Sequence, residues 1–159
     1  MTELCILGVD PGLSGAIAFY FPSRPGLISA EDIPVAGNEV DAASLAARCR
    51  QLAPSVAIVE LVASMPKQGV ASTFRFGQAF GTARGVIAAL EIPTHLVAPT
   101  RWKRHFQLSA DKEGARALAL RLWPSRADIF GRKRDHGRAE AALLARYGAE
   151  VILLPEGGR

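Results

Sequence analysis

Cysteine is scarce in this 159-residue sequence, and long apolar runs are missing altogether. The two cysteines, Cys5 and Cys49, lack the spacing of metal ligands, so they indicate ordinary thiols in a reducing compartment. No stretch approaches the ~20 apolar residues that a membrane span needs. No basic segment precedes the first apolar run, as it would in a signal peptide. These absences predict a cytoplasmic protein without a membrane partner.

Internal repeats and low-complexity segments are also absent, and a hydrophobic content of 49% excludes a disordered chain. We therefore expect a single domain over residues 1–159.

Negative charge is scarce in the C-terminal part of the sequence. Residues 91–159 hold thirteen Lys and Arg against eight Asp and Glu, whereas residues 1–90 are close to neutral. Such an excess is typical of a nucleic-acid partner, although a solvated charged surface has the same composition.

Two short apolar runs each end on one carboxylate. Residues 4–9 precede Asp10, and residues 55–59 precede Glu60. Both runs have the length and composition of buried strands. If the strands are parallel neighbours, the two acids lie side by side at the sheet edge where α/β proteins bind ligands. A charge at the end of a buried strand is costly unless it is paired or binds a metal.

The rest of the pattern predicts an α/β protein. A turn containing Pro11, Gly12 and Gly15 leads into a second strand. Trp123 and Pro124 stop one helix, and Gly148 suits the end of the last one. The apolar run 151–154 has no assigned element. We expect further strands at 16–21, 27–34 and 95–98, helices at 41–52, 70–90, from 99, 111–122 and 137–147, and a basic loop at 124–134.

The predicted helix over residues 70–90 has two different faces. Phe76 and Phe80 belong to an apolar stripe, whereas Gly77, Gly81 and Gly85 recur every fourth residue on another side. Each glycine costs about 1 kcal/mol relative to alanine inside a helix. Three of them in register therefore indicate close approach by another backbone. That backbone belongs either to the chain's own sheet or to a second subunit.

Further acids occur at the start of the last predicted helix. Glu140 is a charge in an apolar helix, His136 lies four residues earlier on the same face, and Asp135 directly precedes it. Together with Asp10 and Glu60 they would form a carboxylate cluster. Such acids repel one another unless divalent cations compensate them, and oxygen ligands suit Mg²⁺ or Mn²⁺. Two such ions in one active site catalyse phosphodiester hydrolysis.

Five segments together resemble the RuvC-type Holliday junction resolvases, particularly the branch that includes the chloroplast resolvases. The resemblance spans nearly the whole chain in the right order. It implies an RNase H-like fold, with a five-stranded mixed sheet flanked by helices on both faces. It also implies a bacterial or phage-encoded, Mg²⁺-dependent homodimer that cuts four-way junction DNA. The segments are GVDPG at 8–12, VE at 59–60, GQAFGTARG at 77–85, PTRWK at 99–103 and DHGRAEA at 135–141.

The resemblance also implies roles for single residues. Lys103 would bind phosphate or stabilise the transition state. Many relatives place their last two acidic positions three residues apart, and Gly137 stands at the first of these here. The division of roles between Asp135 and His136 therefore stays open. The metal ligands would be Asp10, Glu60, Asp135 and Glu140, with His136 and Lys103 as further catalytic residues.

DNA binding and dimerisation follow from the same resemblance and from the charge pattern. The family's junction-opening aromatic after the second acid is missing, which leaves residues 65–68, including Met65, to separate the strands or to read bases. Gly77, Gly81 and Gly85 would form the dimer interface. The predicted DNA-binding residues are Lys67, Gln68, Arg75, Arg101, Lys103, Arg104, Arg132, Lys133 and Arg134.

Three other functions compete with this interpretation. Another RNase H-like nuclease, acting on flaps or RNA/DNA hybrids, would have the same metal site. Actin-like ATPases and sugar kinases also open with a strand, an acid and glycines, but they need a second phosphate-binding loop and a longer chain. A non-catalytic DNA-binding module would not need every acid.

Overall fold

The structure is a computed structural model that describes residues 2–63 and 67–153. Its central feature is one sheet of five strands: β1 Ile6–Asp10, β2 Ala16–Tyr20, β3 Ile28–Asp32, β6 Val56–Glu60 and β7 Thr94–Val97. Their order is β3-β2-β1-β6-β7, and the sheet is mixed. β1 pairs antiparallel with β2 and parallel with β6, which in turn pairs parallel with β7. The predicted five-stranded mixed sheet is therefore confirmed.

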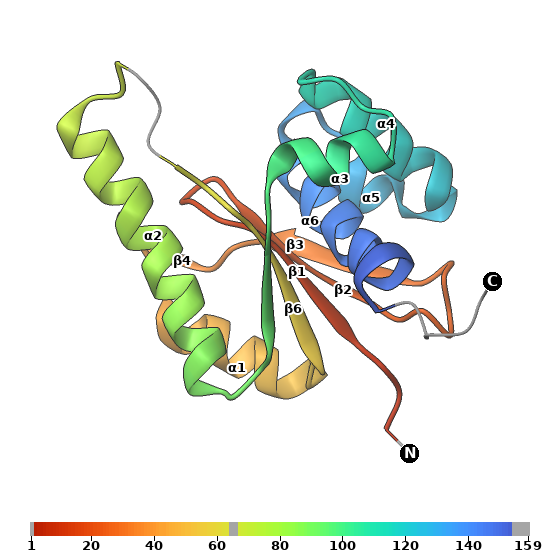
Figure 1. Cartoon of the computed structure of the whole chain (residues 1–159), viewed down its shortest axis with the longest axis horizontal. Helices are drawn as coiled ribbons and strands as arrows, with labels where there is room; N and C mark the ends of the chain where they lie inside the picture. Colours follow the sequence, from red (N-terminus) through yellow and green to blue (C-terminus); the bar gives the residue numbers. More distant parts are fainter. Residues whose placement is uncertain (1, 64–66, 154–159) are drawn as a thin grey trace.

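Helices cover both faces of this sheet, as predicted (Figure 1). One face packs against the first two helices, and the other packs against the helices of the C-terminal half. None of the helices in the described ranges has the length and apolarity that a bilayer crossing needs. The helices are α1 Ala42–Leu52, α2 Val70–Ala89, α3 Pro99–His105, α4 Lys112–Leu122, α5 Ala127–Phe130 and α6 His136–Tyr147.

α6 lies directly against the centre of the sheet, and small residues allow this close approach. A β-carbon at Gly8 would collide with the carbonyl oxygen of Ala141, so β1 needs a glycine where α6 crosses it. α6 contributes buried alanines at positions 139, 141, 142 and 145. This tight contact fixes the position of α6 on the sheet, and thereby places the polar residues of α6 at the carboxyl end of β1.

One prediction about the C-terminal half is wrong, and another is right only in part. The segment 124–134 is not a loop, because it forms the 3₁₀ turns Pro124–Arg126 and Lys133–Asp135 on either side of α5. Buried Ile129 and Phe130 anchor this segment to the core. α6 ends at Tyr147 with Gly148 as its C-cap, as predicted, but Gly148 is not a left-handed stop, because its backbone stays right-handed at φ −56° and ψ −43°.

The chain instead continues from Gly148 as a π-helix over Gly148–Ile152. A β-carbon at Gly148 would lie 2.6 Å from Cγ1 of Ile58, so this glycine serves close packing on β6. Ile152 and Leu153 of the apolar run 151–154 pack against the core, whereas Val151 is exposed. A further hairpin, β4 Val35–Ala36 with β5 Glu39–Val40, was not predicted.

Candidate active site

Three carboxylates converge where β1 and β6 end. The two strands are parallel and pair Val9 with Val59, so Asp10 and Glu60 follow side by side in register. Glu140 reaches the same point from α6. One carboxylate oxygen from each of the three lies within 4.8 Å of the others. The juxtaposition expected from the two strand ends and the last helix is therefore present.

The surroundings of the cluster disfavour three simultaneous negative charges. Burial, followed by the carboxylates of Glu140 and Glu60, raises the pKa of Asp10 well above its usual value. Burial also raises the pKa of Glu60, although a hydrogen bond from Trp102 and the charge of Lys103 act in the opposite direction. The chemistry of this donor set fits a hard divalent cation, which would compensate the charges.

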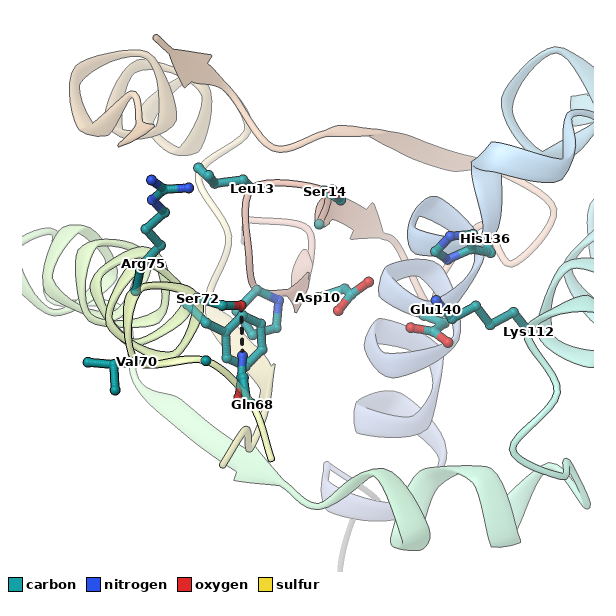
Figure 2. A pocket seen from close by; sticks show the side chains of 15 residues that line it. Asp10, Leu13, Ser14, Gln68, Val70, Ser72, Arg75, Lys112, His136 and Glu140 are labelled. Carbon is teal, nitrogen blue, oxygen red and sulfur yellow. Dashed lines mark hydrogen bonds between the residues drawn. The ribbon is translucent and has the colours of Figure 1, made fainter. Parts of the chain in front are cut away.

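His136 and Lys112 lie beside the carboxylates (Figure 2). His136 is one turn before Glu140 on α6, and its buried Nδ1 atom has no hydrogen-bond partner among the described residues. Lys112, at the start of α4, lowers the pKa of Asp10 through its charge. Lys112 was missed in the sequence because only the packing of α4 on α6 brings it to the site. Its position next to the helix cap Asp111 predicts a helix start and no catalytic role.

The structure does not bring Asp135 into the cluster. Asp135 is buried, and its carboxylate accepts hydrogen bonds from the backbone N–H of Arg132 at 2.8 Å and from Arg132 Nη2 at 2.9 Å. Burial alone would raise the pKa of Asp135, but the bonds to Arg132 lower it below its usual value. Gly137 is the residue that faces the acids, since a β-carbon there would lie 3.3 Å from Asp10 Oδ2.

Two acids of the cluster, Asp10 and Glu140, line a cavity of about 790 Å³. Asp10, Glu140, His136 and Lys112 line one side, and the start of α2 lines the other (Figure 2). On the α2 side, Gln68 donates a hydrogen bond to Ser72 at 3.2 Å, and Arg75 also lines the cavity. Of the predicted residues 65–68, Lys67 and Gln68 are described, whereas Met65 and Pro66 lie outside the described residues.

Most of the other predicted DNA-binding residues line further cavities. Lys103 and Arg104 line one of about 660 Å³. Lys133 and Arg134 line a third one of about 720 Å³ that shares Lys112 and His136 with the first. Arg132 and Arg134 line a fourth of about 500 Å³, which adjoins the first at Leu13, Ser14 and Gly15. Arg101 is exposed on α3.

The glycines of α2 do not serve packing within the subunit. Apart from the adjacent residues and the backbone of the helix itself, no atom in the described part of the chain lies within 4 Å of a β-carbon placed at Gly77, Gly81 or Gly85. The helix contacts its own sheet through buried Ala79, Ala83 and Ile87 instead. The explanation that the glycines seat α2 on its own sheet is therefore wrong.

Comparison with known proteins finds structures of similar fold but no relative by sequence. No protein-family model matches the chain, and a search of curated sequences finds no match. Among solved structures the chain is similar to Thermus thermophilus RuvC in complex with a Holliday junction substrate. The TM-score is 0.65 at 15% identity, over 92% of this chain and 95% of that one.

Two further resolvase structures are similar to the chain. The yeast mitochondrial Holliday junction resolvase has a TM-score of 0.54 at 15% identity, over 90% of this chain and 76% of that one. The fowlpox virus Holliday junction resolvase has a TM-score of 0.53 at 15% identity, over 92% and 99%. The architecture is thus an RNase H-like α/β fold. Within that class, it is the fold of the RuvC-type resolvases, as predicted.

Proposed function

We propose that the protein is a metal-dependent endonuclease that resolves four-way DNA junctions by paired phosphodiester hydrolysis. The observation that carries the proposal is the cluster of Asp10, Glu60 and Glu140 at the strand ends of a RuvC-type fold. Lys and Arg side chains line the cavities around it. This arrangement suits hydrolysis of a nucleic acid. The carboxylates can hold the catalytic cations, and the surrounding Lys and Arg side chains can bind the flanking phosphates.

The cofactor in this proposal is Mg²⁺ or Mn²⁺, two ions per active site. Asp10, Glu60 and Glu140 would hold them, and His136 would complete the set with its Nδ1, which has no hydrogen-bond partner in the described part of the chain. Asp135 is committed to Arg132, so the geometry favours His136 for this position. When bound, the ions would activate water and stabilise the leaving oxygen.

Basic residues of the chain bind and orient the substrate in this account. Lys112 is next to the acids, so it would contact an oxygen of the scissile phosphate. Lys103, on α3, would contact a neighbouring phosphate. The remaining predicted DNA-binding residues would contact the DNA backbone away from the cut. They are Lys67, Arg75, Arg101, Arg104, Arg132, Lys133 and Arg134, together with the polar Gln68.

The active form in this proposal is a homodimer. Resolving a junction needs cuts on two strands related by a two-fold axis, and a two-fold dimer presents two identical sites with that symmetry. The open face of α2 with Gly77, Gly81 and Gly85 supports an interface there, since none of the residues that the structure describes packs against these glycines from elsewhere in the subunit.

Metal-dependent cleavage tests the proposed function. The purified protein should nick a labelled four-way junction in Mg²⁺ and should stop when EDTA is added. Asp10→Asn, Glu60→Gln and Glu140→Gln should each reduce the rate by at least ~10³-fold, because residues that act as one unit lose most of the rate singly. Residual activity within tenfold of wild type in any of the three would contradict its assignment.

A further inference from the structure

Trp102 connects α3 to the carboxylate cluster. It is fully buried, with 0% of its surface exposed, and its indole N–H donates a hydrogen bond to Glu60 Oε2 at 2.8 Å. The fold creates this contact. β6 and β7 are parallel and pair Glu60 with Val97, and α3 begins two residues after Val97, at Pro99. The first turn of α3 therefore passes over the end of β6 and places Trp102 against Glu60.

The chemistry of this hydrogen bond suits a residue that fixes the Glu60 carboxylate in place. An indole N–H is a donor only, so it can bind the carboxylate and cannot compete with it for a cation. A carboxylate has lone pairs on two oxygens, and a donor on Oε2 leaves Oε1 free. Because Trp102 is buried, its side chain has no freedom to swing away. Glu60 itself is only half-buried and would otherwise sample several rotamers.

We propose that Trp102 is the positioning residue for Glu60: it holds one carboxylate oxygen so that the other faces the metal site. This inference rests on the proposed function, because it assigns a partner to one of the proposed ligands. The residue after it, Lys103, has its Nζ 5.4 Å from the centre of the Trp102 ring. One turn of α3 thus fixes both a proposed metal ligand and a proposed phosphate-binding lysine.

The chain contains a matched control for this inference. Its other tryptophan, Trp123, is equally buried and donates its indole N–H to the carbonyl oxygen of Pro25 at 2.9 Å. Trp102→Phe and Trp123→Phe therefore remove the same group from the same hydrophobic core. Only Trp102→Phe removes a bond to a proposed metal ligand. A merely structural role would make the two variants alike.

The test is titration calorimetry of Mn²⁺ into the DNA-free proteins. Loss of a hydrogen bond to a metal ligand typically weakens metal affinity about 10–100-fold. We expect Trp102→Phe to weaken Mn²⁺ binding by at least ~10-fold, and Trp123→Phe to bind like wild type. Equal Mn²⁺ affinity of the two folded variants would overturn the positioning function and leave the metal site standing. Wild type that binds no Mn²⁺ would instead overturn the proposed metal site.

A second measurement does not depend on the folding of Trp102→Phe. The sequence has two tryptophans, so Trp123→Phe leaves Trp102 as the single tryptophan, which can be excited selectively over the two tyrosines. Mg²⁺ added to this variant should change the Trp102 emission, and Glu60→Gln in the same background should remove the change. Constant emission at Mg²⁺ concentrations that calorimetry shows to be saturating would overturn the inference.

Discussion

Arg132 holds the carboxylate of Asp135 through its own backbone N–H and its guanidinium, at 2.8 Å and 2.9 Å. This pair closes the turn that leads into α6 and thereby fixes the start of the helix that carries His136 and Glu140. Two adjacent residues with plausible metal-binding side chains thus have different surroundings. Asp135 is committed within its own turn, whereas the buried Nδ1 of His136 has no partner in the described ranges.

Mutation should separate the two residues. His136→Ala should reduce the cleavage rate by about 100-fold in saturating DNA, since removal of a general acid–base or ligand group typically costs 10²–10⁴-fold. Asp135→Asn should lower stability by about 1–3 kcal/mol, because the turn loses charge-assisted hydrogen bonds. Single-turnover cleavage and thermal denaturation of both variants measure this. An inactive, stable Asp135→Asn beside an active His136→Ala would reverse the assignment.

The carboxylate cluster should destabilise the metal-free protein at neutral pH. The folded-state pKa of Asp10 is raised, so the folded protein holds a proton that the unfolded chain has released. Stability therefore falls as pH rises above about 4 and through the folded-state pKa. Asp10→Asn should raise the melting temperature in EDTA at pH 8 by about 3 °C, the shift that ~1 kcal/mol gives in a domain of this size. The difference should vanish near pH 4.

Asp128→Asn is the control for this measurement. Asp128 is exposed, and its hydrogen bond from Arg126 lowers its pKa, so its loss should leave the melting temperature unchanged or slightly lower at pH 8. Mg²⁺ should raise the melting temperature of wild type and not of Asp10→Asn. An Asp10→Asn protein less stable than wild type in EDTA at pH 8 would contradict the charge repulsion.

The lysines and arginines should divide into two groups. Lys112→Ala should slow cleavage at least tenfold even with DNA in saturation, because Lys112 lies next to the acids. Arg104→Ala should weaken binding equally for all sequences and reduce the salt slope by about 1, because its contact is to a phosphate. Single-turnover rates and binding isotherms at several salt concentrations distinguish the two. A saturated rate of Lys112→Ala equal to wild type would restrict Lys112 to binding.

The open glycine face of α2 predicts the assembly. Light scattering at micromolar concentration should give twice the chain mass of 16.9 kDa. Gly81→Leu should give a folded monomer, because within the described residues its side chain meets nothing in the subunit. Gly26→Leu is the matched control, at an exposed turn glycine with equally open surroundings. A dimeric Gly81→Leu protein would place the interface elsewhere.

Local patterns predicted the parts of the site that lie on strand ends. The apolar runs before Asp10 and Glu60 give both strands, and parallel pairing then places the acids together. Residues that reach the site through tertiary packing left no local signal. Lys112 depends on how α4 lies on α6, and the Trp102–Glu60 bond depends on the register of β6 with β7. The role of Gly148 also depends on tertiary packing. The glycine is required by its close contact with Ile58 and not by a left-handed turn, so the sequence pattern did not predict its conformation.

Substrate choice is the central claim, and one measurement tests it most directly. Wild type and Asp10→Asn are incubated in Mg²⁺ with a four-way junction, the linear duplex of one arm, a flap and an RNA/DNA hybrid of matched sequence. We expect wild type to cut the junction in two symmetry-related strands and to release linear duplexes, with the other substrates cut at least ~100-fold more slowly. Asp10→Asn should bind the junction without cutting it. Equal cleavage of the linear duplex, the flap or the hybrid would contradict junction resolution and leave a nuclease of another substrate class.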